Sequence, residues 1–132
     1  MTGLIALVAV LAAAGPPPPV TGIAPPPAFL RAEAGGVWMQ QGSYCWMRAG
    51  KGVCVDFAGF ADAPVIRLRE GETITISLGF RPAHAGLTAD DRTYRLRPAR
   101  TLRWRVRGHP GVVAVFLRPA LGGDAGYGVR TR

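Results

Sequence analysis

Apolar and polar residues alternate along most of the chain after residue 36, which is the pattern of β-strands with one buried face. The clearest case is residues 72–80, where Ile74, Ile76 and Leu78 are separated by threonine and serine. No segment in this part of the chain has apolar residues at the i, i+3, i+4, i+7 spacing of an amphipathic helix. The sequence therefore predicts an all-β fold.

Other segments with strand character follow at regular intervals, separated by turns that contain glycine or proline. Residues 112–117 are apolar throughout, which predicts a central strand covered on both faces. Residues 81–92 are polar with alanine and glycine, and we predict a loop there. Short strands at roughly ten-residue spacing predict an antiparallel β-sandwich of the immunoglobulin-like type, with a small closed β-barrel as the alternative. The remaining predicted strands are residues 37–40, 44–47, 53–57, 64–69, 93–97, 101–107 and 125–130.

The first 15 residues are predicted to be a signal peptide or an apolar anchor. The apolar run at residues 3–15 would reach roughly 20 Å as a helix, short of the ~30 Å hydrocarbon core of a bilayer. Small residues at 12–14 suit signal-peptide cleavage. No Lys or Arg precedes the run, so either the start lies upstream or the signal is atypical. We expect a secreted or extracytoplasmic protein that contacts a membrane at most through this segment.

Residues 16–35 are predicted to be a proline-rich linker, and residues 36–132 the folded domain. Seven of the twelve residues at 16–27 are proline. Proline has no backbone donor and fixes φ near −65°, so this segment favours extended polyproline II, a semi-rigid spacer. Recognition by a proline-binding groove is the sharper alternative.

A β-hairpin is predicted around the two cysteines, Cys45 and Cys54, because strand-like segments at 44–47 and 53–57 flank a glycine-containing turn. Export makes a disulfide between them possible. Its loop of about ten residues would contribute roughly 2.5–3 kcal/mol in the chain-entropy model. A reduced pair is the competing interpretation. A zinc site is a weaker one, because no second set of ligands lies nearby.

The two faces of this hairpin carry different side chains. If the cysteines are directly opposite each other, Trp46 lies opposite Val53 and Tyr44 opposite Val55, on the face away from the cysteines. We favour the aromatic face toward the core and the disulfide outside. The reverse arrangement stays open.

The chain carries a net charge of +8, with fifteen arginines and one lysine. Arginines alternate with apolar residues at 102–107, so they stand in a row on one strand face, and a second set can join them if strand 93–97 pairs alongside. The arginine fork suits carboxylate and phosphate, which predicts an anion-binding sheet face. The simpler interpretation is a solvated surface in an arginine-rich composition. The candidate anion-binding residues are Arg95, Arg97, Arg103, Arg105 and Arg107.

The partner of such a face would be an anionic envelope polymer, phospholipid head groups, extracellular nucleic acid or an acidic protein. No nucleic-acid-binding motif and no exposed aromatic ladder accompanies the arginines, which argues against a specific nucleic-acid reader.

No group of residues predicts catalysis, a metal site or a cofactor. The serines at 43 and 77 lack the context of an activated nucleophile. The two histidines, His84 and His109, fall in different predicted loops, and no ligand set completes a metal site. The carboxylates lie mostly in turns, where they hydrogen-bond backbone and balance arginine. We therefore predict a non-enzymatic binding module. The alternative is an inhibitor or accessory subunit that uses loop 81–92 or 108–111 against a partner enzyme.

Three segments resemble a group of small exported bacterial proteins. They are Gly-Ser-Tyr-Cys-Trp at 42–46, Gly-Val-Cys-Val-Asp at 52–56, and Gly-Asp-Ala-Gly-Tyr-Gly-Val at 123–129. That group consists mostly of lipoproteins or secreted proteins of high-GC bacteria with one immunoglobulin-like sandwich and no established activity. The resemblance implies a fold and a compartment, and it implies no reaction. This chain lacks the acylated cysteine of the lipoprotein members.

Overall fold

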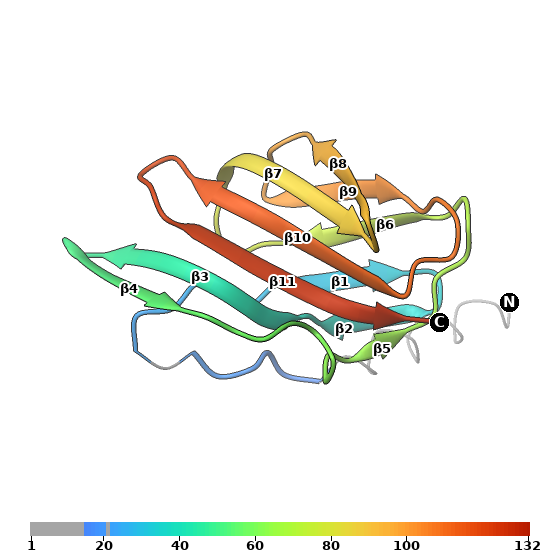
Figure 1. Ribbon diagram of the computed structural model, residues 1–132, viewed down its shortest axis with the longest axis horizontal. Helices are drawn as coiled ribbons and strands as arrows, with labels where there is room; N and C mark the ends of the chain where they lie inside the picture. Colours follow the sequence, from blue (N-terminus) through green and yellow to red (C-terminus); the bar gives the residue numbers. More distant parts are fainter. Residues whose placement is uncertain (1–14, 21) are drawn as a thin grey trace, which may run out of the picture.

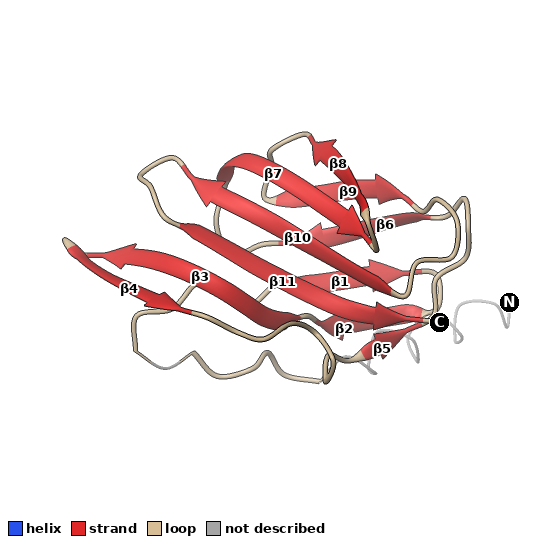
Figure 2. Ribbon diagram, in the orientation of Figure 1, coloured by secondary structure: helices blue, strands red, loops and turns tan. Residues whose placement is uncertain are grey.

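The computed structural model describes residues 15–20 and 22–132, and within them every regular element is a β-strand (Figure 2). The all-β prediction is confirmed. The predicted signal segment, apart from Gly15, lies outside the described residues. The strands form two sheets, which lie one behind the other in Figure 1. The four-stranded sheet has the order β2 (Gly35–Trp38), β1 (Phe29–Ala32), β6 (Thr73–Ser77) and β9 (Thr101–Arg105).

The second sheet has seven strands and is open at its edges, so the closed-barrel alternative is wrong. A short strand, β5 (Val65–Ile66), runs parallel to the end of β11 (Asp124–Thr131), and all other pairs are antiparallel. The main order is β4 (Lys51–Val55), β3 (Gln40–Arg48), β11 (Asp124–Thr131), β10 (Val112–Pro119), β7 (Pro82–Ala89) and β8 (Arg92–Leu96).

The core lies between the two sheets and is built from the alternating residues that the sequence indicated. Ile74 and Ile76 of β6 are fully buried, as are Leu87 of β7 and Val115 of β10 on the facing sheet. Two aromatic pairs also pack against this core. Trp46 of β3 packs against Phe80, in the connection between β6 and β7, with ring centroids 5.0 Å apart. Tyr94 of β8 packs against Trp104 of β9 at 5.3 Å, which joins the two sheets.

The predicted linker at residues 16–35 is wrong in its second half, because residues 28–32 belong to the folded unit. Ala28 and Leu30 are fully buried, and β1 pairs with both β2 and β6. The folded unit therefore begins well before residue 36. Leu30 and Ala32 alternate with Phe29 and Arg31, which is a strand pattern that the preceding prolines concealed.

Residues 22–28, which we call the N-terminal strap, rise at the lower left of Figure 1 and pass behind β3 to reach β1. Pro25 is fully buried, and the hydroxyl of Tyr127 donates a 2.5 Å hydrogen bond to the carbonyl of Pro26. Proline cannot donate to a sheet, but its ring is apolar and its carbonyl still accepts. The strap thus packs as part of the core without adding a strand.

Two other predicted boundaries are corrected. The predicted strand at 37–40 is divided at Met39, where the chain passes from β2 in one sheet to β3 in the other, and the Met39 amide donates to the carbonyl of Ala28 at 2.9 Å. The predicted loop at 81–92 is mostly β7, an inner strand between β10 and β8. Its buried residues are small, Ala85 and Ala89 beside Leu87, so the alternation was weak in the sequence.

The cysteine hairpin has the predicted register, and Cys45 and Cys54 form a disulfide. Tyr44 and Trp46 pack against the core while the disulfide lies on the opposite face, so the favoured orientation is confirmed. The hairpin extends past the neighbouring strands at the left of Figure 1, which leaves Val53 exposed. A disulfide is consistent with an extracytoplasmic location.

Candidate anion-binding surface

Three arginines share the outer face of the four-stranded sheet. Arg31 of β1 is opposite Thr75 of β6, and Thr75 is opposite Arg103 of β9, so the two arginines lie in one row across the sheet. Arg105 lies on the same face of β9, two residues from Arg103. We call Arg31, Arg103 and Arg105 the arginine surface. All three are exposed, and the residues between them along β9, Leu102 and Trp104, are buried.

The dimensions of a sheet fix the spacing of these cations. Residues two apart on a strand are about 7 Å apart, and residues separated by two strand spacings are about 10 Å apart. The other side chains on this face are small hydroxyl residues of β6 and β9 and an aromatic pair, Phe29 and Trp38, in edge contact at 4.9 Å. Arg31 lies over the ring of Phe29, with its guanidinium carbon 5.8 Å from the centroid. That contact orients the arginine along the sheet surface.

The four strands of this sheet contain no Asp or Glu. The acid next to them, Glu72, is buried and turned inward, where its two oxygens accept the backbone amides of Glu33 at 2.9 Å and Arg69 at 2.5 Å. Glu33 pairs with Arg69 at 2.7 Å, the one ion pair found among the described residues. Among the described residues, none of the three arginines of the arginine surface forms an ion pair, although Glu70 lines a hollow together with Arg105.

Carboxylates elsewhere are also bound to backbone amides, as the sequence indicated. Glu70 accepts the amide of Gly108 at 2.7 Å. Asp90 accepts those of Gly111 and Val112 at 2.9 and 3.2 Å. These bonds hold turns at the ends of β6, β7 and β10, so the acids serve the fold instead of pairing with arginine.

Strands β8 and β9 do not pair, so the five predicted arginines do not form one face. Strand β8 pairs with β7 in the seven-stranded sheet, and β9 pairs with β6 in the other. Tyr94 and Trp104 meet across the core, so their neighbours Arg95 and Arg103 point to opposite outer faces. The predicted single surface is corrected to two separate ones.

The other two predicted arginines lie beyond the strand ends. Arg97 follows the end of β8 and is exposed. Arg107 follows the end of β9 and lines a shallow hollow with Asp90, Asp91 and Arg92, so acidic residues lie close to it. Neither residue belongs to the arginine surface. The sequence missed Arg31, whose strand was hidden by the prolines before it.

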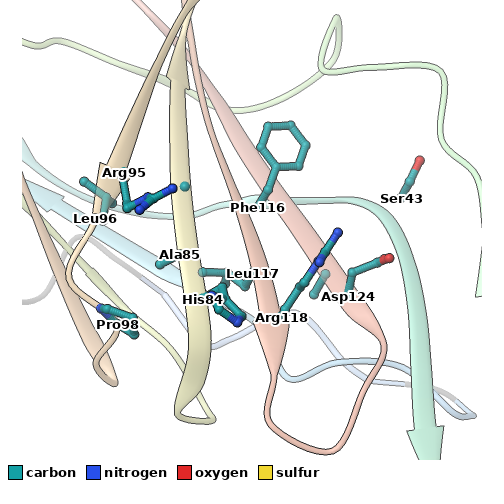
Figure 3. A pocket seen from close by; sticks show the side chains of 12 residues that line it. Ser43, His84, Ala85, Arg95, Leu96, Pro98, Phe116, Leu117, Arg118 and Asp124 are labelled. Atoms are coloured by element: carbon teal, nitrogen blue, oxygen red, sulfur yellow. The ribbon is translucent and has the colours of Figure 1, made fainter.

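Arg95 lines a shallow, open groove of about 670 Å³ on the outer face of the seven-stranded sheet (Figure 3). Phe116 of β10 stands in this groove with 53% of its surface exposed. The sequence predicted that both faces of β10 would be covered, and this prediction is wrong on the outer face. We call this site the Phe116 groove. Its other polar lining residues are Ser43, His84, Arg118 and Asp124.

No three side chains of His, Cys, Asp or Glu cluster closely enough to hold a metal ion in the part of the chain that the structure describes. His84 lies in strand β7, opposite Arg118, and not in a loop as predicted, whereas His109 is exposed in its turn. Across residues 15–20 and 22–132, no helix has the length and apolar character needed to cross a bilayer.

Comparisons with protein-family models, with curated proteins and with solved structures found no match to this chain.

Proposed function

We propose that this protein is an exported, non-enzymatic β-sandwich of the immunoglobulin-like type that binds an anionic polymer through the arginine surface. Two sheets packed face to face, with the chain crossing between them at β2–β3, β5–β6, β6–β7, β8–β9 and β9–β10, support this type of sandwich. The disulfide supports export. A polymer of the cell envelope is the partner that fits this compartment.

One observation carries the proposal. Arg31, Arg103 and Arg105 lie on one outer sheet face whose strands contain no carboxylate. A guanidinium binds carboxylate, sulfate and phosphate through two parallel hydrogen bonds. Cations about 7–10 Å apart on a rigid sheet can contact successive charges of one extended polyanion. An open outer sheet face favours a long chain of repeated charges over a small enclosed ligand.

The test measures binding of the protein to immobilised dextran sulfate between about 50 and 200 mM NaCl. Binding should weaken by about tenfold or more over this range, because each contact releases counterions from the polymer. The variant Arg31→Gln/Arg103→Gln/Arg105→Gln should bind about tenfold or more weakly than wild type, with a shallower salt dependence.

A matched control removes three exposed arginines outside this surface: Arg67→Gln/Arg81→Gln/Arg100→Gln. Both triple variants carry the same net charge, so a general charge effect would weaken both equally. Equal losses in the two variants, or binding that does not respond to salt, would contradict the proposal.

A further inference from the structure

The floor of the Phe116 groove is bare because glycines flank the aromatic ring on both neighbouring strands. Phe116 is opposite Gly86 of β7 and opposite Gly126 of β11. A Cβ atom at Gly86 would come no closer than 3.8 Å to any other atom, which is ordinary contact. Local packing therefore does not require glycine at position 86, and its effect is to leave the ring face open.

The opposite situation holds elsewhere on the same sheet face. At Gly128 and Gly42 a Cβ atom would lie 2.6 Å and 2.8 Å from the ring of Phe60, which covers both positions. The ring of Phe60 thus covers Gly42 and Gly128, whereas the ring of Phe116 is exposed to solvent. An exposed aromatic side chain beside bare backbone is a surface for stacking a flat, partly apolar partner.

Two cations flank the exposed ring. Arg95 is opposite Gly86 on β8, and Arg118 is two residues from Phe116 on β10. Figure 3 shows Arg118 on the same strand as Phe116 and Arg95 on the other side of β7. Within the described residues neither arginine forms an ion pair. The groove thus presents positive charge on two sides of an apolar platform, which is complementary to a ring that carries a carboxylate.

Asp124 adds an acceptor at the β11 end of the groove. One of its carboxylate oxygens accepts the amide of Cys45 at 3.0 Å, which fixes the side chain against β3. The second oxygen has no partner among the described residues and borders the groove. A fixed acceptor of this kind binds a ligand hydroxyl group.

We infer that the Phe116 groove binds a carboxylate-bearing sugar ring within an acidic polysaccharide. The apolar CH face of a pyranose packs against Phe116, the carboxylate pairs with Arg95 or Arg118, and a hydroxyl donates to Asp124. The groove is shallow and open, so the sugar chain can continue past it in both directions. This site lies on the opposite side of the molecule from the arginine surface and stands independently of the function proposed for that surface.

The experiment titrates ¹⁵N-labelled protein with a trimer of galacturonic acid, up to about 10 mM at low salt, and follows the backbone amide signals. Saturable shifts are expected at residues 84–86, 95–96 and 116–118. The fully methyl-esterified trimer has the same rings without the charge, and it should bind about tenfold more weakly.

Two variants test the site, and one serves as the control. Gly86→Thr fills the floor at a position with room for a side chain, and Arg118→Gln removes one cation. Each should weaken binding by about tenfold or more, while Arg67→Gln should leave it unchanged. Folding of each variant is verified from its own amide spectrum.

Three results would overturn the inference. They are the absence of saturable shifts, equal affinity for the acid and its ester, and shifts confined to residues 31 and 101–105. The last result would leave the arginine surface intact as an anion site. Conversely, loss of dextran sulfate binding in the arginine-surface variant has no bearing on the groove.

Discussion

The two outer faces of the sandwich are built on the same alternation, yet they present different chemistry. On the four-stranded sheet, β6 and β9 place threonine, serine or arginine at every outward position. On the seven-stranded sheet, glycines occupy outward positions in β11, β7 and β3, and aromatic rings lie among them. Side chains cover the outer face of the four-stranded sheet, whereas glycines leave part of the backbone bare on the outer face of the seven-stranded sheet.

This difference shows how a sheet obtains two kinds of surface. Closely spaced cations need only the period of two along a strand, so an extended charged surface follows from alternation alone. A concave site on a sheet needs positions without side chains beside one that has a large side chain. Gly86 and Gly126 beside Phe116 meet that condition, and Gly42 and Gly128 would meet it if Phe60 did not cover them.

The largest expected effect is on the free energy of unfolding, and it distinguishes Gly128, which Phe60 covers, from Gly86, which has room for a side chain. Gly128→Val should lower the free energy of unfolding by about 3 kcal/mol, because the new side chain displaces the ring of Phe60. Gly86→Thr should change it by less than about 0.5 kcal/mol or raise it, since threonine favours strands and the site has room. Urea unfolding followed by tryptophan fluorescence measures both. Equal destabilisation of the two variants would break the distinction between them.

A smaller effect concerns Glu72, the buried acid that directly precedes β6. Glu72→Gln should lower the free energy of unfolding by about 2 kcal/mol, because one amide group cannot accept from both the Glu33 and Arg69 backbone amides. The exposed Asp91→Asn is the control and should have little effect. If the stability of the Glu72 variant in urea equals that of wild type, the inward carboxylate does not stabilise this sheet.

The smallest effect concerns the N-terminal strap, which is held by the hydrogen bond from the Tyr127 hydroxyl to the carbonyl of Pro26. Burial raises the pKa of the Tyr127 hydroxyl above its ordinary value, which is about 10. The unfolded chain loses this proton near pH 10 and the folded chain does not, so stability is complete below pH 10 and falls above it, by at most about 1.4 kcal/mol per pH unit.

Tyr127→Phe should cost about 1 kcal/mol at pH 7, because the hydrogen bond to Pro26 is lost. It should also reduce the decline in stability above pH 10. The free energy of unfolding at pH 7, 10 and 11 gives both quantities. Identical declines in wild type and the Tyr127 variant would show that the hydroxyl does not titrate differently in the two states.

The sequence predicted those features that depend on one strand or one hairpin. The register at Cys45 and Cys54 followed from two cysteines and a glycine turn, and the buried face of β6 followed from its isoleucines. Strand β7 was missed because Ala85 and Ala89 bury little area, so their alternation resembles a loop. Strand β1 was missed because prolines precede it.

The arginine surface was predicted only in part, because the sequence pattern describes each strand by itself. Alternation correctly placed Arg103 and Arg105 on one face of their strand, but it contains no information on which sheet a strand joins. Arg95 was assigned to the same surface because β8 and β9 are consecutive, and the chain changes sheet between them. Arg31 could enter the surface only through the pairing of β1 with β6, which joins segments far apart in the sequence.

Strand β11 has a consequence for the order in which the protein can assemble. It is the last of the described strands to be synthesised, yet it lies between β3 and β10 in the seven-stranded sheet. A growing chain that ends before residue 124 holds two separate pieces, β4–β3 and β10–β7–β8, with unpaired edges facing each other. Such non-local pairing slows folding and delays closure of this sheet until β11 has been synthesised. The seven-stranded sheet therefore closes in one late step, after β11 has been made.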